Sequence, residues 1–166
     1  HLPALGKPPW RAISSGAQFE WIDFSWLKRL AAHPSLRLEI AGPGRGAEFS
    51  ELLAIPGVTY HGTCSHSVLK DRIDSCHIGL VPFLNSPLTQ AVDPIKAYEF
   101  AARGLRVWAT PVPGLNSHPF VQETIGTGED LERAISSLAI PLLLPEIPSW
   151  EQRWNSVISC LRQPTA

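Results

Sequence analysis

The sequence has no methionine and only three cysteines among its 166 residues. Because an initiator methionine is missing, we expect the chain to be a fragment or a processed form of a longer protein. Three cysteines (Cys64, Cys76 and Cys160) leave one without a partner and do not make a disulfide framework. We therefore expect a reducing, cytoplasmic setting.

Long apolar runs and runs of basic residues are lacking too. No apolar stretch approaches the about 20 residues of a membrane-spanning helix, and the short run at 142–144 lies between prolines. Residues 1–10 show no charged region followed by an apolar core, so we see no signal peptide. The net charge of −1 argues against a nucleic-acid partner.

Short strand-like runs alternate with helix-length segments along most of the chain. Such alternation implies right-handed crossovers and a parallel sheet that is buried on both faces. We predict an α/β fold with a Rossmann-like, doubly wound parallel sheet of about six strands and helices on both faces. The expected strands are 11–16, 36–41, 58–61, 78–82 and 105–109, and the expected helices are 24–32, 47–54, 67–74 and one between Asp93 and Gly104.

The C-terminal part differs in composition. We divide the chain into a domain at 1–140 and a segment at 141–166, because prolines between 141 and 148 read as a rigid linker. Beyond them an apolar stripe at helical spacing predicts a helix that packs on this domain. The stripe consists of Trp150, Trp154, Ile158 and Leu161.

The most informative segment surrounds Lys96. Asp93 before Pro94 predicts a helix start, because Asp can cap free amides and Pro fits the first helical position. Lys96 and Glu99 then project from one face of the helix. A helix N-terminus favours phosphate, and Lys96 adds a full positive charge. Glu99 can accept hydrogen bonds from sugar hydroxyls, so the helix suits a nucleoside diphosphate-sugar.

This segment resembles the donor-binding motif of the retaining GT-B glycosyltransferases (glycosyl transferases group 1). That motif often reads Asn/Ser-Pro-x-Lys-x-Tyr-Glu-Tyr-x-Ala-x-Gly, followed by a strand and Thr-x-x-Pro-Gly. The resemblance extends over most of the chain, from about Trp10 to Leu161, and is specific for the domain type but not for the sugar. The motif positions that match are Pro94, Lys96, Tyr98, Glu99, Ala102, Gly104, Thr110, Pro113 and Gly114.

The resemblance implies the C-terminal, donor-binding half of a GT-B fold. It also implies that the last helix crosses to the partner domain, because Ser149-Trp-x-x-Arg153 resembles the start of that helix. Lys96 is then expected to contact the diphosphate and Glu99 the ribose hydroxyls of UDP or GDP. In doubly wound sheets ligands lie beyond the carboxyl ends of the strands, where we also expect donor contacts. The further donor-binding candidates are Pro94, Ile95, Thr110, Gly16, His61 and Gly62, with His61 and Gly62 as walls of the base pocket.

The chain departs from the family pattern at two places. The first Glu of many relatives is replaced by Ala91, and the loop at 18–23 lacks the cations that many relatives place beside the pyrophosphate. Lys96 and the helix amides would then carry more of the phosphate charge, with Arg45 or Arg11 as further candidates. We interpret these departures as a subfamily difference.

Other residues invite different interpretations. The His/Cys group around His61 suggests zinc, but its spacing matches no paired Cys-x-x-Cys or His-x-x-x-His ligand set. We therefore predict no metal site and place Cys76 in the core. We also expect the tryptophans at positions 21, 26 and 108 to be core residues.

The function predicted from the resemblance is transfer of a sugar, with retained configuration, from a nucleoside diphosphate-sugar to a saccharide or lipid-linked acceptor. No cofactor or metal is expected. The partners implied are the nucleotide-sugar and an N-terminal domain that is absent here and holds the catalytic residues, so the isolated chain should bind nucleotide weakly and be inactive. We expect a cytoplasmic enzyme with peripheral membrane association of the full protein. The alternatives are a GT-B-fold nucleotide-sugar epimerase and a non-catalytic α/β interaction module.

Overall fold

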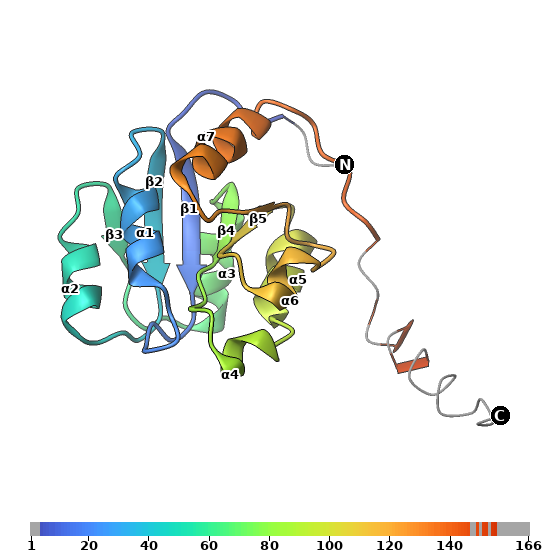
Figure 1. Ribbon diagram of the computed structural model, residues 1–166, viewed down its shortest axis with the longest axis horizontal. Helices are drawn as coiled ribbons and strands as arrows, with labels where there is room; N and C mark the ends of the chain where they lie inside the picture. Colours follow the sequence, from blue (N-terminus) through green and yellow to red (C-terminus); the bar gives the residue numbers. More distant parts are fainter. Residues whose placement is uncertain (1–3, 147–148, 150, 153, 156–166) are drawn as a thin grey trace.

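The apolar strand sequences pair side by side into one sheet in the computed structural model, which describes residues 4–146, 149, 151–152 and 154–155 (Figure 1). All neighbouring strands are parallel, in the order β3-β2-β1-β4-β5-β6. The strands are β1 (Trp10–Ser15), β2 (Leu36–Ala41), β3 (Val58–Tyr60), β4 (Ile78–Val81), β5 (Arg106–Ala109) and β6 (Glu123–Thr124).

Helices cover both faces of this sheet. The helices α1, α2 and α7 pack on one face, and α3 and α5 pack on the other, each layer closing its own apolar cluster. The predicted doubly wound α/β fold with six parallel strands is confirmed. The helices are α1 (Phe24–Ala31), α2 (Ala47–Leu53), α3 (His66–Asp74), α4 (Pro87–Gln90), α5 (Ile95–Ala102), α6 (Pro113–Asn116) and α7 (Gly128–Ser137).

Four elements are absent from the expectations: β6, α4, α6 and α7. Strand β6 has only two residues and owes its existence to pairing with Trp108 and Ala109 of β5, which is a tertiary effect. Helix α7 does have a local signal, a capping box between Thr127 and Asp130.

The helix expected near the C-terminus lies largely outside the described residues, which include neither Trp150 nor Ile158 and Leu161. Trp154 is described, and its side chain is 64% exposed. The division at residues 140 and 141 stays a prediction.

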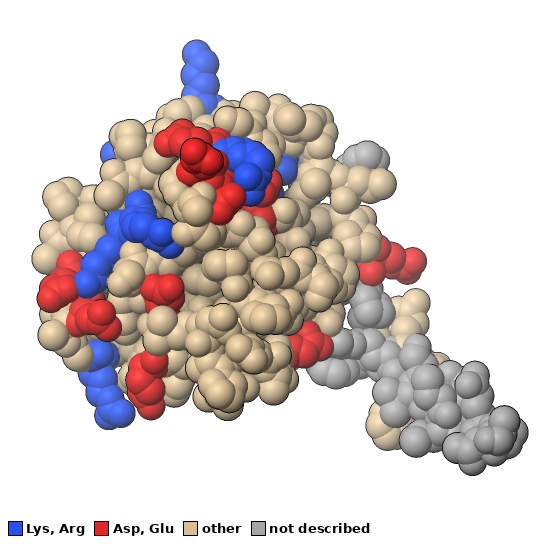
Figure 2. All heavy atoms as spheres, viewed as in Figure 1, with Lys and Arg blue, Asp and Glu red and all other residues tan. Residues whose placement is uncertain are grey.

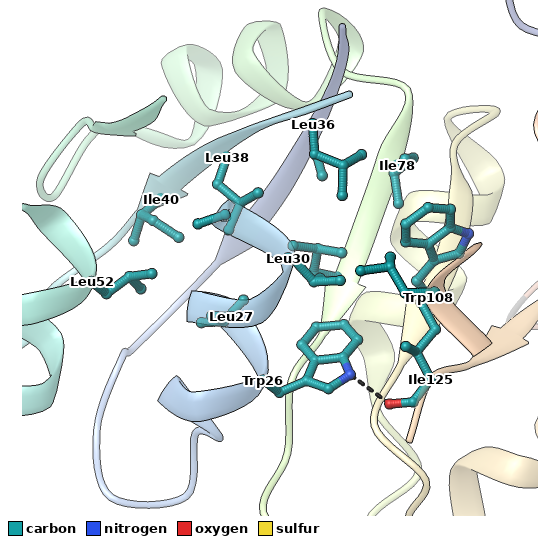
Figure 3. Close-up of a cluster of buried hydrophobic side chains, with 14 of the residues drawn as sticks. Trp26, Leu27, Leu30, Leu36, Leu38, Ile40, Leu52, Ile78, Trp108 and Ile125 are labelled. Atoms are coloured by element: carbon teal, nitrogen blue, oxygen red, sulfur yellow. Dashed lines mark hydrogen bonds between the residues drawn. The ribbon is translucent and has the colours of Figure 1, made fainter. Parts of the chain in front are cut away.

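Trp26 anchors the cluster beneath α1 (Figure 3). Its ring is 1% exposed, and its indole Nε1 donates a 2.7 Å hydrogen bond to the carbonyl of Ile125, which follows β6. The helix is thereby tied to the far edge of the sheet. Trp108 of β5 is fully buried in the same cluster, so the core positions expected for Trp26 and Trp108 are confirmed.

Two glycines allow close approaches that set the carboxyl edge of the sheet. A Cβ atom on Gly79 of β4 would lie 2.3 Å from ring atoms of Phe100, so α5 packs directly on the strand. Gly42 has φ +122°, and a Cβ there would lie 2.1 Å from the carbonyl oxygen of Gly16. The ends of β1 and β2 therefore converge, and α5 is held against the middle of the sheet.

The Trp26 hydrogen bond can be tested against Trp108, whose buried indole N–H has no hydrogen-bond partner within the described residues. Replacing each by Phe removes similar ring volume, but only Trp26→Phe leaves a buried carbonyl unpaired. We expect Trp26→Phe to lower the free energy of unfolding by about 1–3 kcal/mol more than Trp108→Phe. Urea denaturation measures both, and equal losses would contradict a role for this hydrogen bond.

Candidate functional site

Loops from four strands meet at the carboxyl edge of the sheet. The amide of Gly16 after β1 donates to the carbonyl of Ala41, and the amide of Gly42 after β2 donates to the carbonyl of Gly62 after β3, at 2.9 and 2.8 Å. The loop after β1 is also bonded to the loop after β4, through the amide of Asp23 and the carbonyl of Pro82 at 2.8 Å. The expected convergence of these loops is confirmed.

Lys96 and Glu99 lie together on α5, as their spacing predicts. Lys96 Nζ is 2.8 Å from Glu99 Oε2, and both side chains are partly exposed. Lys96 also reaches across to β1, because a Cβ built on Gly16 would be 3.9 Å from Lys96 Cε. These three predicted site residues are thus brought to one place.

A pocket of about 200 Å³ opens beside them, between the ends of β1 and β4. Its walls come from both strand ends, from the loop after β1 and from the start of α5. The main lining residues are Ser15, Gly16, Trp21, Pro82, Phe83 and Lys96. We call this the α5 pocket.

The N-terminus of α5 faces the pocket without a side-chain cap. Pro94 is the N-cap residue and cannot supply a side-chain hydrogen bond. The other described helices of eight or more residues, α1, α3 and α7, are capped by Asp23, Ser65 and Thr127. Uncapped amides and the helix dipole favour an anion. The start of α5 and the Lys96 ammonium therefore create a positive electrostatic potential beside the pocket.

Asp93 is not the cap that its place before Pro94 suggests, so that expectation is wrong. Its carboxylate accepts hydrogen bonds from the Tyr98 hydroxyl at 3.1 Å and from the ring of His118 at 3.2 Å. The tertiary partner His118 turns the carboxylate away from the helix start.

The other predicted residues of this region differ in their surroundings. Pro94 is buried, whereas Ile95 is 61% exposed. Thr110 is 2% exposed, and its hydroxyl donates to the carbonyl of Phe83 at 2.6 Å. The Thr110 side chain thus links the ends of β4 and β5 and faces inward. The roles of these residues toward a ligand stay predictions.

His61 belongs to a buried polar network on the sheet. Its Nε2 is hydrogen-bonded to Glu39 Oε2, and Glu39 Oε1 accepts from Arg11 Nε at 2.9 Å. Burial alone would raise the pKa of Glu39, but the hydrogen bonds from His61 and Arg11 outweigh burial and hold the pKa below 4.5. Glu39 therefore fixes His61 at the end of β3, next to the Gly62 loop.

Arg11 cannot serve as the phosphate cation that we considered. It is the second residue of β1, near the amino edge of the sheet, and it is paired with Glu39. Arg45 is better placed, because it follows β2 at the carboxyl edge. Its guanidinium lies 4.9 Å from the centroid of the Phe19 ring and lines a separate hollow of about 390 Å³.

Trp21 and Phe83 line the α5 pocket, although neither was a predicted site residue. The core position expected for Trp21 holds in part, because the residue is only partly buried but packs against the cluster beneath α1. The signal for both residues is their place in loops that follow β1 and β4. Large aromatic side chains in these loops pack against the core and also line the pocket.

The His/Cys group does not assemble into a metal site in the described part of the chain, where no three His, Cys, Asp or Glu side chains are grouped. Cys76 is buried in the cluster beneath α5, as expected, and burial raises the pKa of its thiol to about 11. This thiol is therefore protonated and packed as a small apolar group.

Comparison with known proteins finds glycosyltransferases that are similar to this chain. No protein-family model matches the chain. The chain is 31% identical over 110 residues to TuaH of Bacillus subtilis (strain 168), a glycosyltransferase whose name assigns it to teichuronic acid biosynthesis. The aligned part is 63% of this chain and 28% of TuaH.

Solved structures of glycosyltransferases are similar to this chain as well. The crystal structure of AviGT4, a glycosyltransferase involved in avilamycin A biosynthesis, is similar over 80% of this chain with a TM-score of 0.61 and 25% identity. The chain therefore has the fold of a GT-B glycosyltransferase domain and is similar in sequence to glycosyltransferases. It also shares its fold with GlyE of Streptococcus pneumoniae TIGR4, at a TM-score of 0.57, 14% identity and 81% coverage.

The chain spans less than half the length of these relatives, 28% of TuaH, 42% of AviGT4 and 34% of GlyE. In the part that the structure describes, no helix combines the length and the apolarity needed to cross a membrane.

The Glu39 network predicts how the stability of this domain depends on pH. Because the folded-state pKa of Glu39 is lowered, its contribution is complete above the unfolded value of 4.5 and is lost as the pH falls through the lowered pKa. We expect Glu39→Gln to reduce the free energy of unfolding by about 2 kcal/mol at neutral pH, since hydrogen bonds to a charged group are lost.

Denaturant unfolding at several pH values between about 3 and 7 measures the difference in free energy of unfolding between the parent chain and Glu39→Gln. This difference should become smaller as the pH falls. Glu51→Gln is the matched control, because Glu51 pairs with Lys28 but is 64% exposed. A Glu39→Gln penalty that does not change with pH, or one equal to that of Glu51→Gln, would contradict the prediction.

Proposed function

We propose that this domain binds the nucleoside diphosphate-sugar donor of a glycosyltransferase. The whole enzyme would transfer the sugar, with retained configuration, to a saccharide or lipid-linked acceptor. The observation that carries the proposal is the meeting of Lys96, Glu99 and Gly16 at the uncapped start of α5, beside the α5 pocket, which we propose as the donor pocket.

The diphosphate would lie at the start of α5. There its oxygens would accept hydrogen bonds from the amides of Ile95 and Lys96, which have no side-chain cap, and from the ammonium of Lys96. An ion pair such as Lys96–Glu99 contributes only about 0.2–0.5 kcal/mol on a helix surface. Lys96 can therefore exchange Glu99 for phosphate at little cost.

Glu99 would then accept hydrogen bonds from the ribose hydroxyls. Its carboxylate is one turn along α5 from Lys96, which matches the distance from a phosphate to the sugar of the same nucleotide. The loop at His61 and Gly62 is our proposal for the wall of the base pocket, and the nucleotide would be UDP or GDP.

Departure of the diphosphate is the chemical step in which this domain takes part. Positive charge that is already in place stabilises negative charge as it develops on the leaving group. Lys96 and the α5 amides supply such charge, so we propose a reaction without a metal or a cofactor. The acceptor site and the residues that assist transfer would belong to a further domain of the full enzyme.

Two other functions fit the fold. A nucleotide-sugar epimerase would use the same diphosphate contacts, and a non-catalytic interaction module would use none of them. The order Pro94, Ile95, Lys96, Tyr98 and Glu99 favours a transferase over an epimerase through its resemblance to the transferase motif.

Titration calorimetry with UDP, GDP and ADP tests the diphosphate contact. We expect weak binding of UDP or GDP and at least a tenfold loss with Lys96→Ala, since a charged hydrogen bond contributes about 1.5–3 kcal/mol. The matched control is Arg133→Ala, which removes an equivalent pair with Asp130 at 2.9 Å, three residues apart on α7. If none of the three nucleotides gives a heat of binding, the result would favour the interaction module and overturn the proposal.

The ribose contact can be separated from the phosphate contact. Glu99→Ala should weaken binding of UDP or GDP, but it should not weaken binding of the 2′,3′-dideoxy form of the same nucleotide. The reason is that the dideoxy ribose has no hydroxyl that could donate a hydrogen bond to Glu99. Equal losses for both ligands would mean that Glu99 acts only through Lys96.

A further inference from the structure

A second hollow, which we call the apolar groove, adjoins the α5 pocket. Its volume is about 270 Å³. The α5 pocket and the apolar groove share two walls, because Trp21 and Phe83 line both. The groove is lined by Trp21, Phe83, Leu88, Thr89 and Val92.

The apolar groove lies on a surface that has few charges. Three large apolar side chains of the loop and helices around it are exposed: Leu84 by 41%, Leu88 by 66% and Ile95 by 61%. Figure 2 shows that the surface over α4 and α6 carries few Lys, Arg, Asp or Glu side chains, whereas the surface over α1, α2 and α7 carries many.

The side chains that line the groove offer almost no hydrogen bonds. None of the five residues is charged, and only Thr89 and Trp21 have polar side-chain atoms. Thr89 is 3% exposed, and its hydroxyl is already used, because it donates to the carbonyl of Leu84 and accepts from the amide of Ser86. The indole N–H of Trp21 is left as the side-chain donor of the groove.

We propose that the apolar groove receives the C6 edge of the donor sugar and selects a 6-deoxy sugar, with a methyl group in place of the hydroxymethyl group. The inference rests on the proposed function, because it places the diphosphate at Lys96. The two hollows share two walls, so a sugar joined to that diphosphate can direct its C6 edge into the groove and keep its ring hydroxyls outside it.

Elementary physical chemistry sets the direction of the preference. A methyl group against Leu88, Val92 and Phe83 leaves water without losing a hydrogen bond. A hydroxymethyl group loses its hydrogen bonds with water and finds few here, and a uronate carboxylate meets no positive charge in the lining. The groove therefore disfavours both hydroxylated and acidic sugars at this position.

Matched ligands test the inference with the 166-residue chain. Calorimetry would compare UDP-glucose, UDP-6-deoxyglucose and UDP-glucuronate, and also GDP-mannose and GDP-6-deoxymannose, with UDP and GDP as references. We expect the 6-deoxy sugar to bind about tenfold more tightly than its hydroxylated partner, the effect of one well-placed apolar group. The uronate should bind no better than UDP.

Leu88→Gln should reduce the preference for the 6-deoxy sugar to less than about threefold without changing the affinity for UDP or GDP. Leu143→Gln is the matched control, because Leu143 is 69% exposed and lines neither hollow, and it should change nothing. Since both leucines are exposed, both variants should keep the melting temperature of the parent chain.

Three results would overturn the inference. If UDP or GDP binds but the matched sugars bind equally, the groove does not select the sugar, although the proposed function stands. If no nucleotide binds, both fail. If the chain sediments as a dimer and Leu88→Gln makes it a monomer, the groove is an interface between copies.

Discussion

The contact between Phe100 and Gly79 is the constraint on which the site depends. Because Gly79 has no side chain, the ring of Phe100 rests on the backbone of β4 and α5 approaches the sheet closely. This contact fixes where α5 begins, and therefore where Lys96 and the free amides point. The convergence of Gly16 and Gly42 brings the opposite wall to the same place. The geometry of the site is thus set by packing contacts and does not depend on its charged groups.

The electrostatics of the site follow from this packing. The free amides of α5 and the Lys96 ammonium face a pocket, and Glu99 is the counter-charge within reach of that ammonium. The other ionic network, Arg11–Glu39–His61, is centred on the buried carboxylate of Glu39. One network can rearrange when an anion binds, whereas the other is held by burial and by two hydrogen bonds to one carboxylate.

The sequence predicts what depends on local spacing. The parallel α/β sheet and the Lys96–Glu99 pair follow from the alternation of strands and helices and from positions three apart on a helix. Asp93 could not be placed in this way, because its partner His118 lies 25 residues away in the sequence. Trp21 was also out of reach, since an aromatic residue in a loop gives no periodic signal. What the sequence misses is set by contacts between distant segments.

The segment around α4 has a consequence for how such domains diversify. The first turn of helix α4 is stabilised locally, through a capping box between Ser86 and Thr89 and a proline at its start. The exposed side chain of Leu88 takes no part in this and can therefore be exchanged without disturbing the strands or the start of α5. In such a domain the nucleotide contacts and the sugar preference depend on different elements, the start of α5 and helix α4. Substitutions in one short helix can then change the preferred sugar during evolution, while the nucleotide contacts are inherited unchanged.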